Sequence, residues 1–283
     1  MPANLYALGA IALWTLFASL GVSLKHVPPF LLTGIALLIG SALTLPIVLR
    51  NRAQWKIPAA TLTLGVYGLF GFHFLLFIAL RHAPAVEANL VNYLWPLFIV
   101  VLAPLFLRGV RLHTVHVAAA LLGFAGAAIA ILGASGSDGG GSSSGGWSWG
   151  YLPALGSAFI WASYSLLTKR VPAFPTAAIG LFGLVSGVLS LLCHWALEPA
   201  AALSAQDWGL LAVMGLGPLG AAFFLWDKAL KLGDARQIGI LSYLTPLGST
   251  ALLMLVSGRA LTWSIALAAV MIIGAALLGT RAK

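Results

Sequence analysis

Ten long apolar stretches, each close to the length of a membrane-spanning helix, constrain this sequence more than any other feature. A helix needs about 20 apolar residues to cross the hydrocarbon core of a bilayer. The stretches are joined by short connections, which is typical of antiparallel neighbours in a bundle. The sequence therefore predicts an all-α integral membrane protein with ten transmembrane helices. These cover residues 4–24, 29–49, 57–80, 83–107, 112–134, 148–170, 175–196, 206–231, 233–256 and 262–280.

The composition excludes a soluble globular enzyme. Only 7% of the 283 residues are charged and 61% are hydrophobic, whereas a soluble domain carries about 25% charged residues. Basic residues stand singly or in pairs between apolar stretches, so the net charge of +9 indicates membrane topology rather than nucleic-acid binding. The single cysteine, Cys193, excludes an internal disulfide framework and a cysteine metal site. We expect no metal and no cofactor.

The basic residues fall mainly on one side of the predicted bundle. Of the 15 Lys+Arg, 12 lie at the C-terminus or in loops on the N-terminal side, leaving Lys25, Arg81 and Arg259 opposite. The positive-inside rule places such basic loops in the cytoplasm. We therefore expect a multi-pass protein of the bacterial inner (plasma) membrane with both termini cytoplasmic. We also expect a monomer whose partners are the lipid bilayer and a small-molecule substrate.

The two halves of the chain repeat each other. At a shift of 150, residues 65–97 align with 215–247 without a gap, and the most specific match is Tyr93–Leu97 with Tyr243–Leu247. Because each half holds five predicted helices, the second half enters the membrane from the opposite side. The pattern predicts an inverted repeat with a substrate site where the halves meet. We assign the first repeat to 1–134, a Ser/Gly-rich linker to 135–147 and the second repeat to 148–283.

Aromatic and polar residues recur at helical spacing near the middles of several predicted spans. Aromatic residues of an interfacial belt lie near helix ends, so central rings favour a cavity over ordinary packing. Pro96 and Pro246, at equivalent repeat positions, are expected to kink their helices as hinges. For Trp95, exposure to lipid is an alternative. The candidate substrate-binding residues are Trp14, His73, Phe77, Asn89, Tyr93, Trp95, Trp161, Tyr164, Ser242 and Tyr243.

His73 is the only histidine predicted deep within a span, and two roles are open for it. It could hydrogen-bond a substrate or take up a proton, or it could be a core histidine that donates to a neighbouring carbonyl. No carboxylate is predicted at mid-bilayer. Because coupled transporters usually keep one there, we expect facilitated movement, with weak proton coupling at most.

Ten helices in an inverted five-plus-five repeat resemble the drug/metabolite transporter superfamily, specifically the EamA-type bacterial exporters. The specific marks are Leu94–Leu97 and Leu244–Leu247, both Leu-x-Pro-Leu, and the early tryptophans Trp14 and Trp161 of each half. The central aromatic content is most similar to the aromatic amino-acid exporter branch. The resemblance implies predicted spans 1, 3, 4, 6, 8 and 9 around a cavity, spans 5 and 10 at the periphery, and alternating access.

These features predict a secondary transporter that exports small metabolites, with aromatic and other neutral amino acids as leading cargo. A same-fold transporter of drugs, purines or sugars is one alternative, and a membrane-embedded enzyme is another. An enzyme needs a nucleophile with a base in reach, and the sequence shows no Ser/His or Cys/His arrangement. We therefore expect no catalytic residues. A passive channel is disfavoured because the spans lack rings of charged residues.

Overall fold

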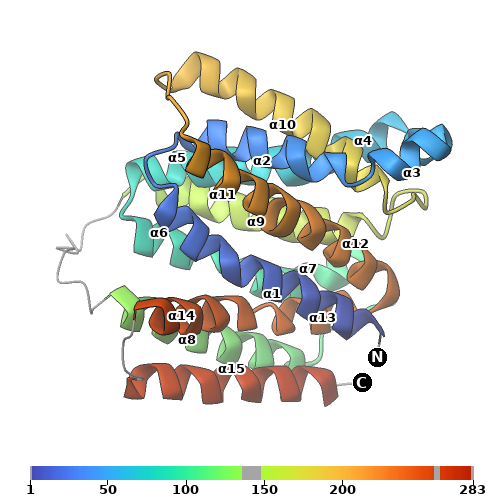
Figure 1. The fold of residues 1–283 in the computed structure, drawn as a ribbon. Coiled ribbons are helices and arrows are strands. Elements are labelled where there is room, and N and C mark those ends of the chain that lie inside the picture. Colours follow the sequence, from blue (N-terminus) through green and yellow to red (C-terminus); the bar gives the residue numbers. More distant parts are fainter. Residues whose placement is uncertain (1, 136–147, 258–261, 282–283) are drawn as a thin grey trace.

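The computed structural model describes residues 2–135, 148–257 and 262–281, and every element in these ranges is a helix (Figure 1). The predicted linker, apart from Ser135, lies outside the described residues. Three short segments differ from α-helix: the 3₁₀ turn η1 (Arg52–Trp55) and the π-helical turns η2 (Tyr67–Gly71) and η3 (Gly217–Ala221). The α-helices are α1 (Pro2–Ser23), α2 (Pro29–Ala42), α3 (Leu45–Arg50), α4 (Ala59–Val66), α5 (Phe72–His82), α6 (Ala85–Asn92), α7 (Trp95–Phe106), α8 (Thr114–Ser135), α9 (Tyr151–Leu167), α10 (Ala178–Leu197), α11 (Ala205–Leu216), α12 (Ala222–Leu232), α13 (Ala235–Leu241), α14 (Leu244–Ser257) and α15 (Trp263–Arg281).

The predicted helical membrane fold is confirmed for the described residues. Six helical segments are long and apolar enough to cross a membrane, and α2 and α15 are shorter apolar helices. The count of ten spans stays a prediction, and three of the predicted spans are divided by a turn. Span 29–49 divides into α2 and α3, span 83–107 into α6 and α7, and span 233–256 into α13 and α14. The six long segments are Pro2–Ser23, Ala59–His82, Ala85–Phe106, Thr114–Gly133, Ala178–Leu197 and Ala205–Leu232.

The helices form layers, with the cavity-lining helices in the middle (Figure 1). Helices α2 and α10 pack together at one face, and α8 and α15 pack together at the opposite face. Between these pairs, α1 packs on α12 and α14, while α9 packs on α5 and α7. The two outer pairs therefore enclose a central group to which both halves of the chain contribute.

Local helix geometry repeats at the same shift of 150 that relates the two halves of the sequence. The bounds of η2 and η3 correspond residue for residue at this shift, and so do those of α5 and α12. Helical geometry is also interrupted at Tyr93 and at Tyr243, the two tyrosines of the repeated motif. Proline explains the position of both breaks, since its ring clashes with the carbonyl four residues earlier. Pro96 and Pro246 each stand three residues after their tyrosine.

One buried carboxylate ties three helix ends together. The side chain of Glu198, which follows α10, is 1% exposed. It accepts hydrogen bonds from the Phe30 and Leu31 backbone N–H groups at the start of α2, at 3.0 and 3.3 Å. It also pairs with Arg81 at the end of α5 at 2.9 Å and with His194 at 3.0 Å. These partners satisfy a charge that would otherwise be costly to bury.

Two glycines let the π-helical turn η3 approach α2 closely. A Cβ atom built on Gly220 would lie 2.9 Å from the Cα of Gly40, and one on Gly40 would lie 2.8 Å from the Cα of Gly220. Backbone atoms cannot move aside as the end of a flexible side chain can. The contact between α2 and η3 therefore depends on the absence of both side chains.

We expect Gly220→Ala to destabilise the purified protein by about 1–3 kcal/mol, because the added methyl group overpacks this contact. The measurement is thermal unfolding in detergent. Gly209→Ala is the matched control, since a Cβ atom at Gly209 on α11 would meet nothing within 4 Å. An equal effect of the two substitutions would contradict the role of the α2–η3 contact.

Candidate functional site

A cavity of about 380 Å³ lies in the central layer of helices. This volume falls within the range of about 300–1,000 Å³ that is usual for small-molecule sites. The lining comes from α1, α5, α6, α7, α9, η3, α12 and α14, which lie in predicted spans 1, 3, 4, 6, 8 and 9. The lining residues are Trp14, Phe17, Ala18, Gly21, Phe72, His73, Leu76, Phe77, Leu80, Ala85, Asn89, Asn92, Tyr93, Trp95, Trp161, Leu219, Phe223, Thr245 and Ser249.

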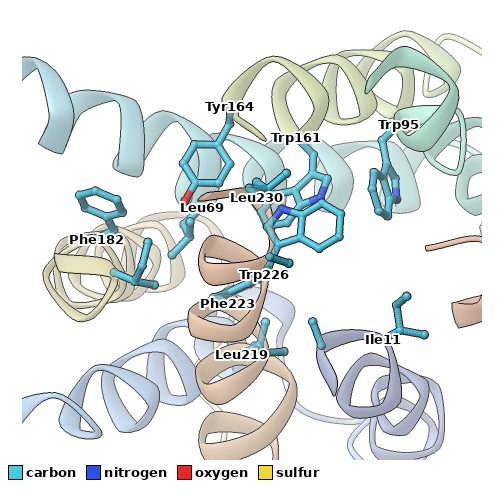
Figure 2. Close-up of a cluster of buried hydrophobic side chains, with 14 of the residues drawn as sticks. Ile11, Leu69, Trp95, Trp161, Tyr164, Phe182, Leu219, Phe223, Trp226 and Leu230 are labelled. Atoms are coloured by element: carbon cyan, nitrogen blue, oxygen red, sulfur yellow. The ribbon is translucent and has the colours of Figure 1, made fainter. Parts of the chain in front are cut away.

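Four tryptophans from four different helices meet at this cavity, and three of them (Trp14, Trp95 and Trp161) line it. The ring centroids of Trp14 and Trp161 lie 5.9 Å apart, and Trp226 lies 5.2 Å from Trp14 and 5.6 Å from Trp95. Figure 2 shows the Trp161 and Trp226 rings against each other, with Trp95 beside them. Edge-to-face and offset contacts of this kind stabilise packing beyond simple area burial. The aromatic cluster therefore joins both halves of the chain.

Two indole N–H groups of this cluster donate hydrogen bonds to neighbouring helical segments. Trp14 Nε1 donates to the Pro218 carbonyl oxygen at 3.1 Å, and Trp226 Nε1 donates to Ser165 Oγ at 3.1 Å. Pro218 lies in the π-helical turn η3, and π turns often occur at functional sites. These bonds fix the orientation of two rings that would otherwise be held by apolar contact alone.

A few polar groups face the cavity between the rings. His73 Nδ1 lies 2.6 Å from the Leu69 carbonyl oxygen, so it carries the hydrogen and leaves Nε2 as an acceptor in the neutral ring. The buried Thr245 hydroxyl has no hydrogen-bond partner within the described structure. Asn92 Oδ1 accepts from Ser157 Oγ at 2.8 Å. His73 thus bonds a core carbonyl and also lines the cavity, while its part in substrate binding or proton uptake stays a prediction.

The described cavity lining contains no Asp, Glu, Lys or Arg side chain. A buried charge without a counter-ion would be costly in this apolar surrounding. The lining therefore favours a ligand with no net charge and a large apolar group. A zwitterion also meets this condition, because its two charges cancel.

Seven of the ten predicted substrate-binding residues line the cavity: Trp14, His73, Phe77, Asn89, Tyr93, Trp95 and Trp161. The other three, Tyr164, Ser242 and Tyr243, are buried outside its lining. Tyr164 packs over Gly68, and Tyr243 packs over Gly123 on α8. Ser242 donates its hydroxyl to the Gly239 carbonyl oxygen of its own helix at 2.5 Å. The predicted hinge prolines, Pro96 and Pro246, lie near the starts of α7 and α14 and do not line the cavity.

Several cavity residues were absent from the predicted site. Phe223 on α12 lines the cavity, and Trp226 on the same face of α12 packs against the lining tryptophans without lining the cavity itself. Trp226 lies near the end of its predicted span, so its position gave no signal of a central role. Thr245 and Ser249 are four residues apart on α14, so helical spacing places them on one face.

The cavity opens towards one end of the bundle, the end opposite the two chain termini. Leu80, at the end of α5, is 38% exposed there, and Ala85 at the start of α6 is exposed. The repeat equivalents of these residues, Leu230 and Ala235, are each 1% exposed. The structure is therefore open at one end and closed at the other, although the two halves have related sequences.

A partly buried ion pair lies at the closed end. Lys231 Nζ contacts Asp227 Oδ2 at 2.6 Å and donates to the Phe174 carbonyl oxygen at 2.8 Å. Thr176 Oγ1 donates to the same carboxylate oxygen at 2.6 Å. These bonds join α12 to the segment that precedes α10 and thus hold the closed end together.

Apolar helices around an uncharged, aromatic central cavity define the class of multi-pass membrane transporters. The chain belongs to the EamA-like transporter family, whose model matches residues 1–132 and 148–281. It is 40% identical over 287 residues to the aromatic amino acid exporter YddG of Ancylobacter novellus, covering 98% of this chain and 96% of that one. The YddG exporter of Salmonella typhimurium is 30% identical, with 98% and 96% of the two chains covered. A solved structure described only as "Crystal structure of protein" superimposes with a TM-score of 0.89 at 37% identity, covering 99% of this chain and 97% of that one.

We expect Asp227→Asn to loosen the closed end, because the amide cannot form the ion pair with Lys231. The probe is a cysteine introduced at Leu230 in a Cys193→Ala background, and the measurement is its rate of maleimide labelling in detergent. Labelling should rise several-fold in the Asp227→Asn variant. Arg50→Gln, which removes an exposed charge elsewhere, should leave the rate unchanged. A rate that does not respond to Asp227→Asn would show that the ion pair does not hold this end closed.

Proposed function

We propose that this protein is a secondary transporter that exports small neutral metabolites across the bacterial inner membrane, with aromatic and other neutral amino acids as its cargo. The observation that carries the proposal is the central cavity, whose described lining is rich in aromatic rings and contains no charged side chain. The family assignment and the names of the two full-length relatives support the same function.

The cavity offers complementary groups for each part of an amino acid. The rings of Trp14, Trp161 and Phe223 provide an apolar surface for an aromatic side chain. The ammonium group brings hydrogen-bond donors, and neutral His73 offers its Nε2 lone pair as an acceptor. Asn89 and the Thr245 hydroxyl can donate to the carboxylate. Binding in this arrangement requires no buried counter-ion.

Transport in this proposal proceeds by alternating access in a ten-helix inverted repeat, made of residues 1–134 and 148–283 joined by 135–147. The equivalent bounds of η2 with η3 and of α5 with α12 support the repeat. The opposite exposure of Leu80 and Leu230 supports the exchange of open and closed ends. Rocking of one half against the other would open the closed end and bury the open one. In this motion the helices would bend at the breaks next to Pro96 and Pro246.

The proposal places both termini in the cytoplasm, so that the described cavity is open to the outside. It treats the protein as a monomer. It assigns no catalytic role to the cavity, in keeping with the transporter family and the exporter names of the relatives.

Purified protein in liposomes should transport labelled phenylalanine in preference to labelled aspartate or lysine, which carry a net charge. Trp161→Ala should weaken phenylalanine transport about twofold to tenfold, because one aromatic pair contributes about 0.5–1.5 kcal/mol. Threonine transport should fall less, since threonine has no ring. Initial rates at matched protein levels provide the measurement.

Two further variants separate a lost contact from a lost fold. Trp161→Phe keeps a ring and should retain most phenylalanine transport. Trp208→Ala removes a tryptophan that is 51% exposed outside the cavity, and it should transport both cargoes normally. Equal loss of phenylalanine and threonine transport in Trp161→Ala would assign this ring a structural role. Absence of transport for a wide panel of neutral metabolites would contradict the proposed function.

Reporter fusions at Ser142 and after Lys283 should report opposite sides of the membrane. Five spans precede Ser142 in the proposed topology, so this site lies outside while the C-terminus lies in the cytoplasm. The measurement is the activity of a reporter that works on only one side. If both fusions report the same side, the five-plus-five topology is wrong.

A further inference from the structure

A second cleft lies at the closed end of the bundle, away from the aromatic cavity. It has a volume of about 640 Å³ and is lined by Leu107, Arg108, Val110, Lys169 and Arg170, which we call the basic cleft. Three of its five residues are cationic, and none is acidic. The first three follow α7, and the last two follow α9. One half of the chain therefore contributes one cation, and the other half contributes two.

The local backbone holds these cations close to the helix ends. Gly109 has a φ of 75°, in the left-handed region that favours glycine, so the chain turns immediately after Arg108. The Arg170 N–H donates to the Leu167 carbonyl oxygen at 2.8 Å, which continues the last turn of α9. The negative ends of the two helix dipoles stabilise these cations, and they offset part of the cations' attraction for an anion. Arg108, Lys169 and Arg170 are exposed, so a ligand can reach the basic cleft from outside the protein.

The charges of the basic cleft are not neutralised by the described protein. No described ion pair involves Arg108, Lys169 or Arg170. Lys169 Nζ instead donates to the Gly233 carbonyl oxygen at 2.6 Å. Partial burial of this ammonium group lowers the Lys169 pKa, and the charge of Asp234 opposes the effect. Asp234 itself is paired with Arg236 at 2.5 Å. An anion in the cleft would therefore supply missing counter-charge.

The position of the basic cleft matches the headgroup region of a bilayer. Both α7 and α9 end within a few residues of it, and Leu105, one turn before Arg108, is 75% exposed. The exposed leucine provides an apolar surface for the acyl chain of a lipid. The clustered cations next to it provide positive charge for the lipid headgroup. Basic pockets between helices on the cytoplasmic side are a known form of lipid-binding site.

We propose that the basic cleft binds a phosphate anion, presented by the headgroup of an anionic phospholipid, between the ends of α7 and α9. Arginine side chains donate to phosphate oxygens through a planar fork, and Arg108 and Arg170 supply two such forks from different halves of the chain. The bound phosphate bridges the two halves at their closed end. It therefore favours the conformation in which the aromatic cavity is open at the opposite end.

The test measures thermal unfolding of the full-length protein in detergent with added phosphatidylglycerol, phosphatidylcholine or inorganic phosphate at matched ionic strength. Phosphatidylglycerol should raise the unfolding midpoint more than phosphatidylcholine does. The double variant Arg108→Gln/Arg170→Gln should weaken the apparent affinity for phosphatidylglycerol roughly thirtyfold, because each basic side chain contributes about a fivefold step. Native mass spectrometry should show fewer retained phosphatidylglycerol molecules in this variant.

Two variants keep the result interpretable. Arg50→Gln/Arg52→Gln removes two exposed basic residues from the same end of the bundle but outside the cleft, and it should respond like the unmodified protein. Arg108→Lys/Arg170→Lys keeps the charge and should retain part of the affinity.

Each outcome bears on the proposal directly. Stabilisation by inorganic phosphate alone, lost in the glutamine variant, would support the anion site but assign it to a soluble phosphate. An equal response to the anionic and zwitterionic lipids would overturn the proposal. So would an unchanged response in a folded Arg108→Gln/Arg170→Gln variant, whatever the transport activity of the protein.

Discussion

In a bilayer core no water is present to satisfy backbone N–H and C=O groups, so irregular backbone is tolerated only where protein encloses it. Most of this structure follows from that constraint. The described helices depart from regular geometry mainly at η2, at η3 and at the breaks beside Tyr93 and Tyr243. These departures lie in the central layer, where side chains from other helices can serve as partners. The Trp14 indole, which donates to the Pro218 carbonyl oxygen, is one such partner.

Under the proposed function, these irregular points are where the central helices bend, while the outer layers stay packed. The pairs α2–α10 and α8–α15 form the outer layers, and no residue of these four helices lines the cavity. The residues whose exposure differs between the repeats, such as Leu80 and Leu230, lie on α5 and α12, next to the π-helical turns. A carrier built this way can change the shape of its centre while its lipid-facing layers stay packed.

The sequence predicted the helical membrane class and most of the cavity because both depend on composition and spacing. Trp14 and Trp161 were found because central rings are unusual in apolar spans. Tyr243 was placed in the site by its equivalence to Tyr93, yet it lies buried over Gly123. A repeated sequence cannot show which end of the protein is open, because that asymmetry belongs to the conformation. The broken span at α2 and α3 was also missed, since apolar residues continue across it.

The uncharged aromatic lining has a consequence for how long a ligand stays bound. Contacts with rings are individually weak and only loosely directional, and no described charge in the lining anchors a ligand by a buried ion pair. Residence times in such a site are short, and modest affinity is shared among ligands of similar shape. A carrier of this kind remains largely empty at low ligand concentration and fills only when its ligands accumulate. Under the proposed function, such a lining suits the export of accumulated ligands better than the uptake of scarce ones.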